Sequence, residues 1–218
     1  MATNYHVVSD IDGDLVAVFR DGTRRRVLGL LAVDEAHDLA LVKIEGNNYP
    51  ALPLASSESV RVGEPIVLLG SSAGLDQSLG LGVISALRPE GFPDEWKRQY
   101  ERAGKKITRG SIVQHTASSA PGSSGSPVVD MEGRVVAVHH SQLTTGPIYF
   151  GAHVDELRAL LARTDLAAPV HPIGPNIRRN LLISGAVVAA IALALFVEAM
   201  IRRIRGKGRE KKRSETLQ

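Results

Sequence analysis

The 218-residue chain contains no cysteine. This absence excludes a disulfide scaffold, a thiol nucleophile and a zinc site built on cysteine. Residues 1–201 also lack an excess of positive charge, because 18 basic residues stand against 21 acidic ones and the net charge is −3. The pI of about 9.3 comes from residues 202–218, whose net charge is +6. An acidic domain lacks the basic surface that nucleic acids require, so we predict no nucleic-acid partner.

One segment has almost no charge. The run LLISGAVVAAIALALFVEAMI occupies residues 181–201, and Glu198 is its single charged residue. As a helix it spans about 31 Å, which matches a hydrocarbon core of about 30 Å. Arginines flank both ends of the run, and Glu198 lies one helical turn before Arg202, with which it can pair near the interface. We therefore predict a single transmembrane helix at residues 181–201.

The flanking segments predict the topology and the domain limits. Basic residues concentrate in the tail, 202–218, so we expect this tail in the cytoplasm and residues 1–180 outside it. Residues 164–180 contain three prolines and are typical of a short, semi-rigid linker. The expected folded domain is therefore residues 1–163, attached to the cell membrane by one span, and no PDZ-like segment lies between it and the linker.

Residues 1–163 have the pattern of an all-β fold. Asp12-Gly13 and Asp21-Gly22 are hairpin-turn signals between short apolar runs. The expected strands are 5–9, 14–20, 24–33, 38–44, 65–70, 82–87, 111–116, 126–130, 134–140 and 147–154. Residues 88–110 are expected to form a long charged loop, and residues 154–163 have the apolar spacing of a closing helix. Many short strands with one terminal helix favour an antiparallel sandwich or barrel.

The segment from Gly122 to Ser126 carries the clearest chemical signal. Ser124 precedes a glycine in a tight loop that leads into an expected strand. Glycines let the backbone turn so that successive N–H groups can stabilise an oxyanion. Ser123 and Ser126 compete with Ser124 for the role of nucleophile. An α/β-hydrolase elbow is excluded, because it needs glycine at position 126 and a helix afterwards.

Two further residues complete a possible triad. His6 lies in the segment Ala2–Val8, at the mouth of an expected strand, and Asp38 directly precedes an apolar strand. A serine hydroxyl needs a general base, and an imidazole held by a carboxylate can serve as that base. Asp34 or His37 would be the fallback partners if the register were different.

These blocks resemble the chymotrypsin-like serine proteases, and in particular the bacterial HtrA/Deg branch. Thr3-Asn4-Tyr5-His6-Val7-Val8 is similar to the family's histidine block, and Asp38–Lys43 is similar to its aspartate block. The stretches Arg61–Gly70 and Gly82–Leu87 resemble the opening of its second barrel, and Gly122–Ser126 resembles its serine block. The resemblance covers residues 2–163, with the blocks in the family's order.

The resemblance implies a fold and a mechanism. It implies two antiparallel six-stranded β-barrels, the first incomplete at its N-terminal end, followed by a C-terminal helix. His6 would be the general base, Asp38 would orient it, and Ser124 would be the nucleophile that forms an acyl-enzyme with a polypeptide substrate. Backbone N–H groups of the segment Gly122-Ser123-Ser124, those of Gly122 and Ser124 above all, would form the oxyanion hole. No metal or other cofactor is implied.

The serine block departs from the HtrA pattern at Ser126-Pro127. The form Gly-x-Ser-Gly-Ser-Pro resembles that of glutamyl endopeptidases, which have the same fold and place a histidine in the wall of the specificity pocket. His139 occupies the matching position here, with His140 next to it, and Ser119 would lie on the opposite wall. The resemblance therefore implies a preference for glutamate before the cut bond.

The histidine block stands unusually early in the chain. The family places two to three strands before its histidine, whereas only five residues precede His6. We expect the native product to carry an N-terminal extension with a secretion signal and these strands. The alternative function is an inactive trypsin-like domain that acts as a membrane-tethered binding or sensor module.

Overall fold

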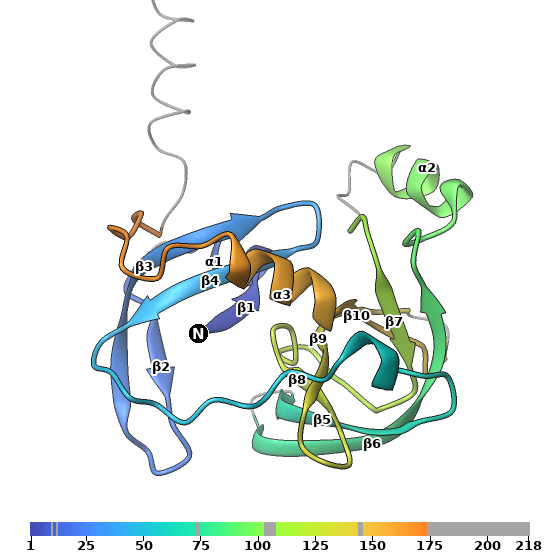
Figure 1. Ribbon diagram of the computed structural model, residues 1–218, viewed down its shortest axis with the longest axis horizontal. Coiled ribbons are helices and arrows are strands. Elements are labelled where there is room, and N and C mark those ends of the chain that lie inside the picture. Colours follow the sequence, from blue (N-terminus) through green and yellow to red (C-terminus); the bar gives the residue numbers. More distant parts are fainter. Residues whose placement is uncertain (10, 12, 73–74, 103–107, 144–145, 174–218) are drawn as a thin grey trace, which may run out of the picture. The chain divides into compact units, whose positions relative to one another are not determined.

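The computed structural model describes residues 1–9, 11, 13–72, 75–102, 108–143 and 146–173, which belong to one compact unit (Figure 1). The predicted transmembrane helix at 181–201 and the basic tail at 202–218 lie outside the described residues. None of the helices within the described part is both long enough and apolar enough to cross a bilayer.

The first half of the unit is an open sheet of four antiparallel strands in the order β1-β4-β3-β2. Its strands are β1 (Ala2–Asn4), β2 (Val16–Val18), β3 (Arg24–Asp34) and β4 (Leu39–Ile44). A tight turn at Asp21-Gly22 joins β2 to β3, as predicted, and Gly22 has a φ of 79° that suits glycine. This four-stranded sheet stands where the sequence predicted an incomplete first barrel.

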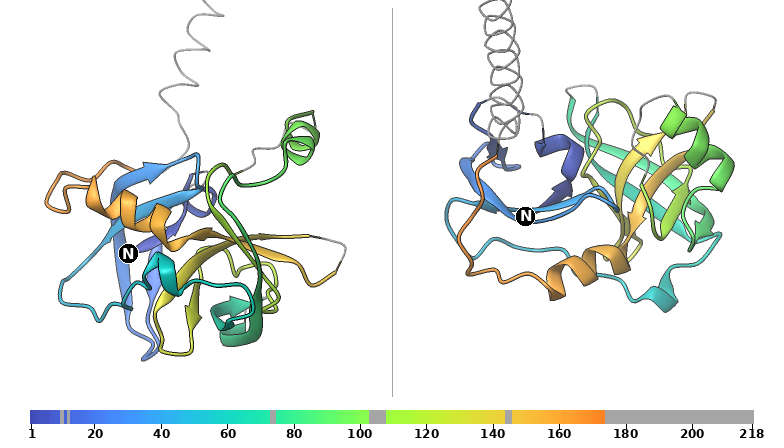
Figure 2. Two further views of the ribbon diagram at one scale, coloured as in Figure 1. Left: turned by 45° about the vertical axis from the view of Figure 1, so that its right-hand side comes forward. Right: turned by 90° about the horizontal axis from the view of Figure 1, so that it is seen from above.

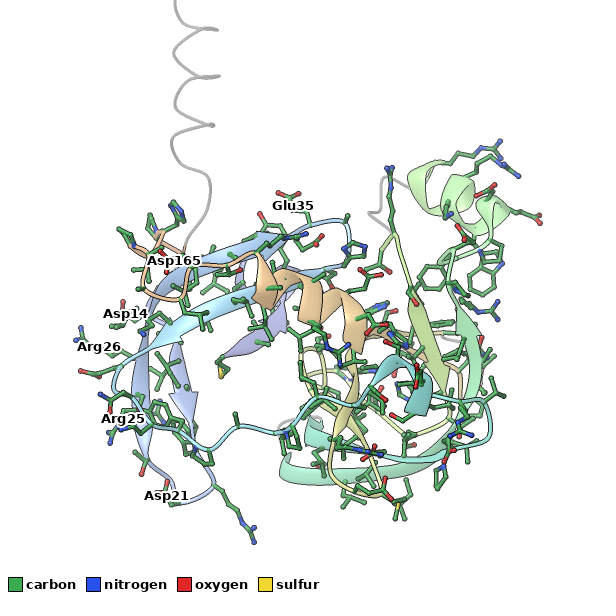
Figure 3. All side chains as sticks on the ribbon, in the orientation of Figure 1. Asp14, Asp21, Arg25, Arg26, Glu35 and Asp165 are labelled. Carbon is green, nitrogen blue, oxygen red and sulfur yellow. The ribbon has the colours of Figure 1, made fainter. Side chains whose placement is uncertain are left out.

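The end of this sheet around β2 and the start of β3 is exposed. Val16, Val18 and the first three arginines of β3 all reach solvent, so the usual alternation of buried and exposed residues is absent here. Asp21, Arg25 and Arg26 project from the β2–β3 hairpin away from the rest of the domain (Figure 3). This end of the sheet thus exposes two valines beside its arginines, and Phe19, directly after β2, stacks on Tyr49.

The second half is a closed barrel, and it confirms the predicted six-stranded second barrel. Its strand order is β10-β7-β6-β5-β8-β9, with antiparallel pairing throughout. The strands are β5 (Pro65–Ser72), β6 (Leu75–Arg88), β7 (Ile112–His115), β8 (Pro127–Asp130), β9 (Val135–Gln142) and β10 (Tyr149–His153). Its interior is filled by small and branched apolar side chains such as Val113, Val128 and Val136.

The sheet and the barrel share a core under the C-terminal helix α3 (Val154–Ala162). Leu157 and Leu160 of α3 pack with Leu39 and Leu41 of β4 and with Val138 of β9. Helix α3 accordingly lies against strands of both halves (Figures 1 and 2). This shared core is important for function because the two halves carry different parts of the predicted site.

The sheet borders a largely apolar pocket of about 730 Å³. Leu31 and Leu41 line it from the sheet, Val135 and Val138 line it from β9, and Leu157 lines it from α3. The amino group of Met1 donates a hydrogen bond of 2.8 Å to the carbonyl of Val42 at its margin.

Two local predictions were wrong. Residues 5–9 were expected as a strand, but Tyr5–Val8 form the short helix α1, because its backbone is bound to the β3–β4 turn rather than to a neighbouring strand. Residues 88–110 were expected as a loop, but they include the helix α2 (Asp94–Arg102). Helix α2 projects from the barrel near β7 in both views (Figures 1 and 2), and Trp96 stacks on Phe92 at its base.

Candidate active site

His6 and Asp38 are held together by two hydrogen bonds. Nδ1 of His6 lies 2.6 Å from Oδ2 of Asp38, and the His6 N–H donates to Oδ1 at 2.9 Å. His6 sits on α1, directly after β1, and Asp38 ends the turn between β3 and β4. The side chain of Asp38 is 15% exposed and that of His6 is 50% exposed, so the pair lies at the surface with its carboxylate sheltered. This is the arrangement in which a carboxylate fixes the orientation of a general base.

The backbone of Asp38 is as firmly held as its side chain. Asp38 has a φ of 54°, in the left-handed region that aspartate tolerates better than most residues. Its carbonyl accepts hydrogen bonds from the Tyr5 N–H at 3.1 Å and from Nδ2 of Asn4 at 3.0 Å. Asn4 is fully buried. Asn4 lies inside the histidine block but was not among the predicted site residues, and its hydrogen bond helps to hold the Asp38 turn in place.

The environment of His6 favours its protonated form. The hydrogen bond to Asp38 raises the pKa of His6, burial opposes this, and the negative charge of Asp38 raises the pKa further. A raised pKa makes the imidazole a stronger base, which suits removal of a proton from a hydroxyl group.

The serine loop is shaped by two glycines in left-handed conformations, Gly122 at φ 100° and Gly125 at φ 86°. The Ser123 N–H donates to the Ala120 carbonyl at 3.0 Å, which closes a tight turn, so this N–H is already engaged and does not serve an oxyanion. Gly125 and Ser126 likewise donate to His139 and Ser123. Within the described residues, the N–H groups of Gly122 and Ser124 donate to no acceptor, as an oxyanion hole requires.

The loop packs directly on the segment that carries His6. A side chain at position 125 would collide with Oγ1 of Thr3, so glycine permits this approach. Ser124 is half-buried beside this contact. No hydrogen bond within the described residues joins Ser124 to His6. Catalytic hydrogen bonds are often long in ligand-free sites and shorten when substrate binds, so the arrangement is compatible with a triad.

The other candidates for the triad have different partners. Asp34 and His37 pair with each other, and His37 also lies 3.4 Å from Oε2 of Glu156 on α3. Ser126 is buried, and its hydroxyl packs against the backbone of Gly70. The structure therefore brings His6, Asp38 and the Ser124 loop together and leaves the alternative residues outside.

The three predicted specificity residues are not equivalent. Ser119 donates to Oε1 of Gln142 at 3.1 Å, so the segment before the serine loop lies across from the end of β9. The His139 N–H donates to the Ser126 carbonyl and the His139 carbonyl accepts from the Gly125 N–H, which places His139 beside the serine loop. His140 is enclosed, with Nδ1 on the Ser141 hydroxyl and no partner for Nε2 among the described residues. His140 is thus unavailable to a substrate in this structure.

Burial keeps both histidines of β9 neutral. Burial lowers the pKa of His139 to about 4, and the charge of His6 contributes to this shift. Burial lowers the pKa of His140 to about 3, although the carboxylate of Asp38 acts in the opposite direction. Within the described residues, no group of three or more histidine or acidic side chains is arranged to hold a metal ion.

An open sheet that carries a His–Asp pair beside a closed barrel that carries a serine loop defines the chymotrypsin-like class of serine peptidase folds. Residues 1–138 match the family model described as a trypsin-like peptidase domain. This match covers more than half of the chain, which therefore belongs to the trypsin-like peptidase family.

Individual relatives confirm the resemblance to the HtrA branch. A DegP-like protein of Pseudomonas putida, described as a probable periplasmic serine endoprotease, is 31% identical over 149 residues, which are 68% of this chain and 28% of that protein. The mitochondrial serine protease HTRA2 of Drosophila willistoni is 30% identical over 161 residues, covering 74% and 35% of the two chains. The HtrA-type protease AlgW with a decapeptide is similar in structure, with a TM-score of 0.61 and 26% identity over 74% of this chain and 48% of that one. The chain thus spans about a third of these two curated relatives.

Proposed function

We propose that this domain is a serine endopeptidase that cleaves peptide bonds through an acyl-enzyme. The observation that carries the proposal is the His6–Asp38 pair, in which the 2.6 Å contact at Nδ1 leaves Nε2 available to the serine loop. Ser124 Oγ attacks the substrate carbonyl while His6 accepts its proton, and His6 then gives this proton to the leaving amine. Water hydrolyses the ester with His6 again as the base. The decapeptide in the AlgW structure supports a polypeptide as substrate.

The test is covalent labelling of the whole chain with a serine-reactive fluorophosphonate. We expect the wild-type protein to be labelled, the Ser124→Ala variant to remain unlabelled, and the matched control Ser126→Ala to keep most of the label, because the Ser126 hydroxyl packs on Gly70. A folded wild-type protein that takes up no label would favour the alternative, a membrane-tethered binding module. The missing hydrogen bond between Ser124 and His6 is the observation that favours this alternative.

We further propose that the site prefers glutamate before the cut bond. Nε2 of His139 has no hydrogen-bond partner among the described residues, and His139 is bonded through its backbone to the serine loop. Ser119 lies across the same segment, and an imidazole with a hydroxyl can bind a carboxylate without a fixed positive charge. Faster cleavage of peptides with glutamate than with alanine or valine, lost on His139→Gln, is the expected result. Equal cleavage of all three peptides by the wild-type protein would refute the preference.

We also propose that the chain is anchored in the membrane by residues 181–201, with the peptidase domain outside the cytoplasm and residues 202–218 inside. The support is the length of the apolar run and the concentration of basic residues after it.

A further inference from the structure

The segment that follows helix α3 folds back onto the open sheet. Residues 164–173 leave α3 in a turn, in which the Thr164 N–H donates to the Leu161 carbonyl, and then run toward the edge of β3 (Figures 1 and 2). Leu30 and His171 exchange two backbone hydrogen bonds of 2.8 Å each, which form an antiparallel bridge. Strand β2 pairs only with the first three residues of β3, so the bridge occupies the edge of β3 beyond β2.

The sequence around the bridge suits this path. Pro172 biases His171 toward an extended backbone, which is the conformation that an antiparallel bridge requires. Gly29 has a φ of 153° and lies against the segment, so that a side chain there would begin 2.5 Å from the His171 carbonyl oxygen and 2.8 Å from Cβ of Val170. Glycine at position 29 therefore permits the close approach.

Ile173 reaches the apolar cluster that also contains the end of helix α1. Val8 of α1 and the β4 residues Ala40 and Val42 form the buried part of this cluster, and Ile173 packs against it. Helix α1 has only four residues, too few to be stable through its own backbone hydrogen bonds, so its position depends on what it contacts. Its first two residues are bonded to Asp38, and Val8 at its end is buried in the cluster.

His6 stands on α1 between these two supports. Its side chain is 50% exposed, so its orientation depends on the hydrogen bond to Asp38 and on the position of the α1 backbone. Resting on the peptidase function proposed above, we infer that residues 170–173 form a positioning strap for His6, in which Ile173 acts on the general base through the cluster around Val8. A docked strap keeps α1 where His6 reaches Asp38 at 2.6 Å, and a displaced strap lets α1 move.

The strap acts by packing and not by charge. The titratable groups that interact with His6 are Asp38 and, on β9, His139 and His140, and none of them belongs to the strap. His171 contributes its backbone, while its side chain is exposed. A change at Ile173 can therefore alter the pKa of His6 only by moving α1.

The test measures the rate of fluorophosphonate labelling of the full chain across the pH range. We expect Ile173→Ala to slow labelling about tenfold, because small displacements of a reacting group are costly in rate, and to lower the pH midpoint, because the hydrogen bond that raises the pKa of His6 is weakened. Ile173→Leu keeps an apolar side chain of the same volume and should restore most of the rate. Leu166→Ala, at an exposed position of the same segment, is the matched control and should change neither quantity.

A second variant displaces the strap without changing the cluster. Gly29→Ala places a methyl group against the His171 carbonyl, so the amides of Leu30 and His171 should exchange hydrogen faster, and labelling should show the same slower rate and lower midpoint. Gly22→Ala also imposes a positive φ, of 79°, but its added carbon meets nothing within 4 Å, so it controls for backbone strain.

Denaturant unfolding gives the folded fraction of each variant and separates the outcomes. A folded wild-type protein that takes up no label overturns the proposed peptidase function and the strap with it. A wild-type protein that is labelled, with the same rate per folded molecule and the same midpoint in Ile173→Ala and Gly29→Ala, overturns the strap alone, whether or not these variants are less stable.

Discussion

Asp38 combines more interactions than any sequence motif indicates. Its carboxylate accepts from the backbone and the ring of His6, and its carbonyl accepts from Asn4 and Tyr5. These bonds tie the turn that carries Asp38 to the segment that carries His6. The pair is therefore oriented before any substrate arrives, and such preorganisation is the main source of catalytic power in this chemistry.

The first prediction at the residue scale concerns pH. His6 must be neutral to accept the proton of Ser124, and its pKa is raised, so fluorophosphonate labelling should increase with pH through a midpoint above the ordinary histidine value of about 6.5. Asp38→Asn removes the hydrogen bond that raises the pKa, so the midpoint should move down while the rate falls by about 10⁴-fold. Labelling rates measured across the pH range check both effects. An unchanged midpoint in Asp38→Asn would contradict the assigned cause.

The second prediction concerns Asn4. Asn4→Ala removes the buried hydrogen bond to the Asp38 carbonyl, and we expect a loss of about 1–3 kcal/mol in the free energy of unfolding together with slower labelling of Ser124. Denaturant unfolding and labelling rates provide the measurements. Asn47→Ala, at an exposed position, is the matched control and should leave both unchanged.

A network of polar contacts joins several elements next to Asp38, and His37, the residue before Asp38, lies at its centre. Arg163, at the end of α3, pairs with Asp34, the last residue of β3. Oδ1 of Asp34 lies 2.9 Å from Nδ1 of His37, and His37 reaches Glu156 in the first turn of α3. Oε1 of Glu156 accepts from the N–H of Ser111 at 2.9 Å, just before β7. These contacts thus link the β3–β4 turn to the second barrel.

The first prediction at the scale of elements is that loss of the His37 contacts shifts the position of Asp38. His37→Gln breaks at least one of the two contacts to carboxylates, so we expect the domain to lose about 1–3 kcal/mol and Ser124 labelling to slow. The downfield NMR resonance of the His6 Nδ1 proton should broaden, which a loss of stability elsewhere would not cause. Glu45→Gln is the control, because its ion pair with Arg26 is exposed and should contribute less than about 1 kcal/mol. An unchanged resonance in His37→Gln would refute the link.

A second prediction for the elements tests the contact between sheet and barrel. Gly125→Ala places a methyl group against Thr3 and forces alanine to adopt a φ of 86°. We expect a loss of about 1–3 kcal/mol and nearly complete loss of labelling, since the serine loop must move away from His6. Gly133→Ala has a similar φ of 77° but nothing within 4 Å of its added carbon, so it controls for backbone strain. Equal effects of both changes on labelling would show that the contact with Thr3 is unimportant.

At the scale of the whole molecule, the site exists only where the two halves meet. The open sheet supplies His6 and Asp38, the barrel supplies Ser124 and His139, and the apolar core under α3 holds the halves together. Neither half contains all three residues of the proposed triad.

The last prediction concerns attachment to the membrane. The full chain expressed in bacteria should remain in the membrane fraction after an alkaline carbonate wash, because residues 181–201 are long enough to span the bilayer. Ile191→Arg places a charge at the centre of the run at a cost of about 3 kcal/mol and should release part of the protein. External protease should spare residues 202–218 in intact cells. If all of the wild-type protein were found in the soluble fraction after the carbonate wash, the proposed membrane anchor would be contradicted.

Prediction from sequence succeeded where the signal was local. The β3 and β4 strands, the second barrel and α3 follow from apolar periodicity, and turn residues such as Asp21-Gly22 mark where hairpins close. It failed at α1, where Val7 and Val8 favour a strand but the bonds of Tyr5 and His6 to Asp38 produce a helical turn. Helix α2 was missed because its polar sequence resembles a charged loop.

The residues of the proposed triad were therefore predicted from the sequence alone, since each stands in a short block whose neighbours indicate its role. What only the tertiary structure decided is how residues from distant blocks act on one another. Asn4 lies 34 positions from the carbonyl it holds, and Leu30 of β3 pairs with His171, which follows α3. Hydrogen bonds of that kind depend on the pairing of strands and the packing of the sheet on the barrel, and no local pattern of residues records them.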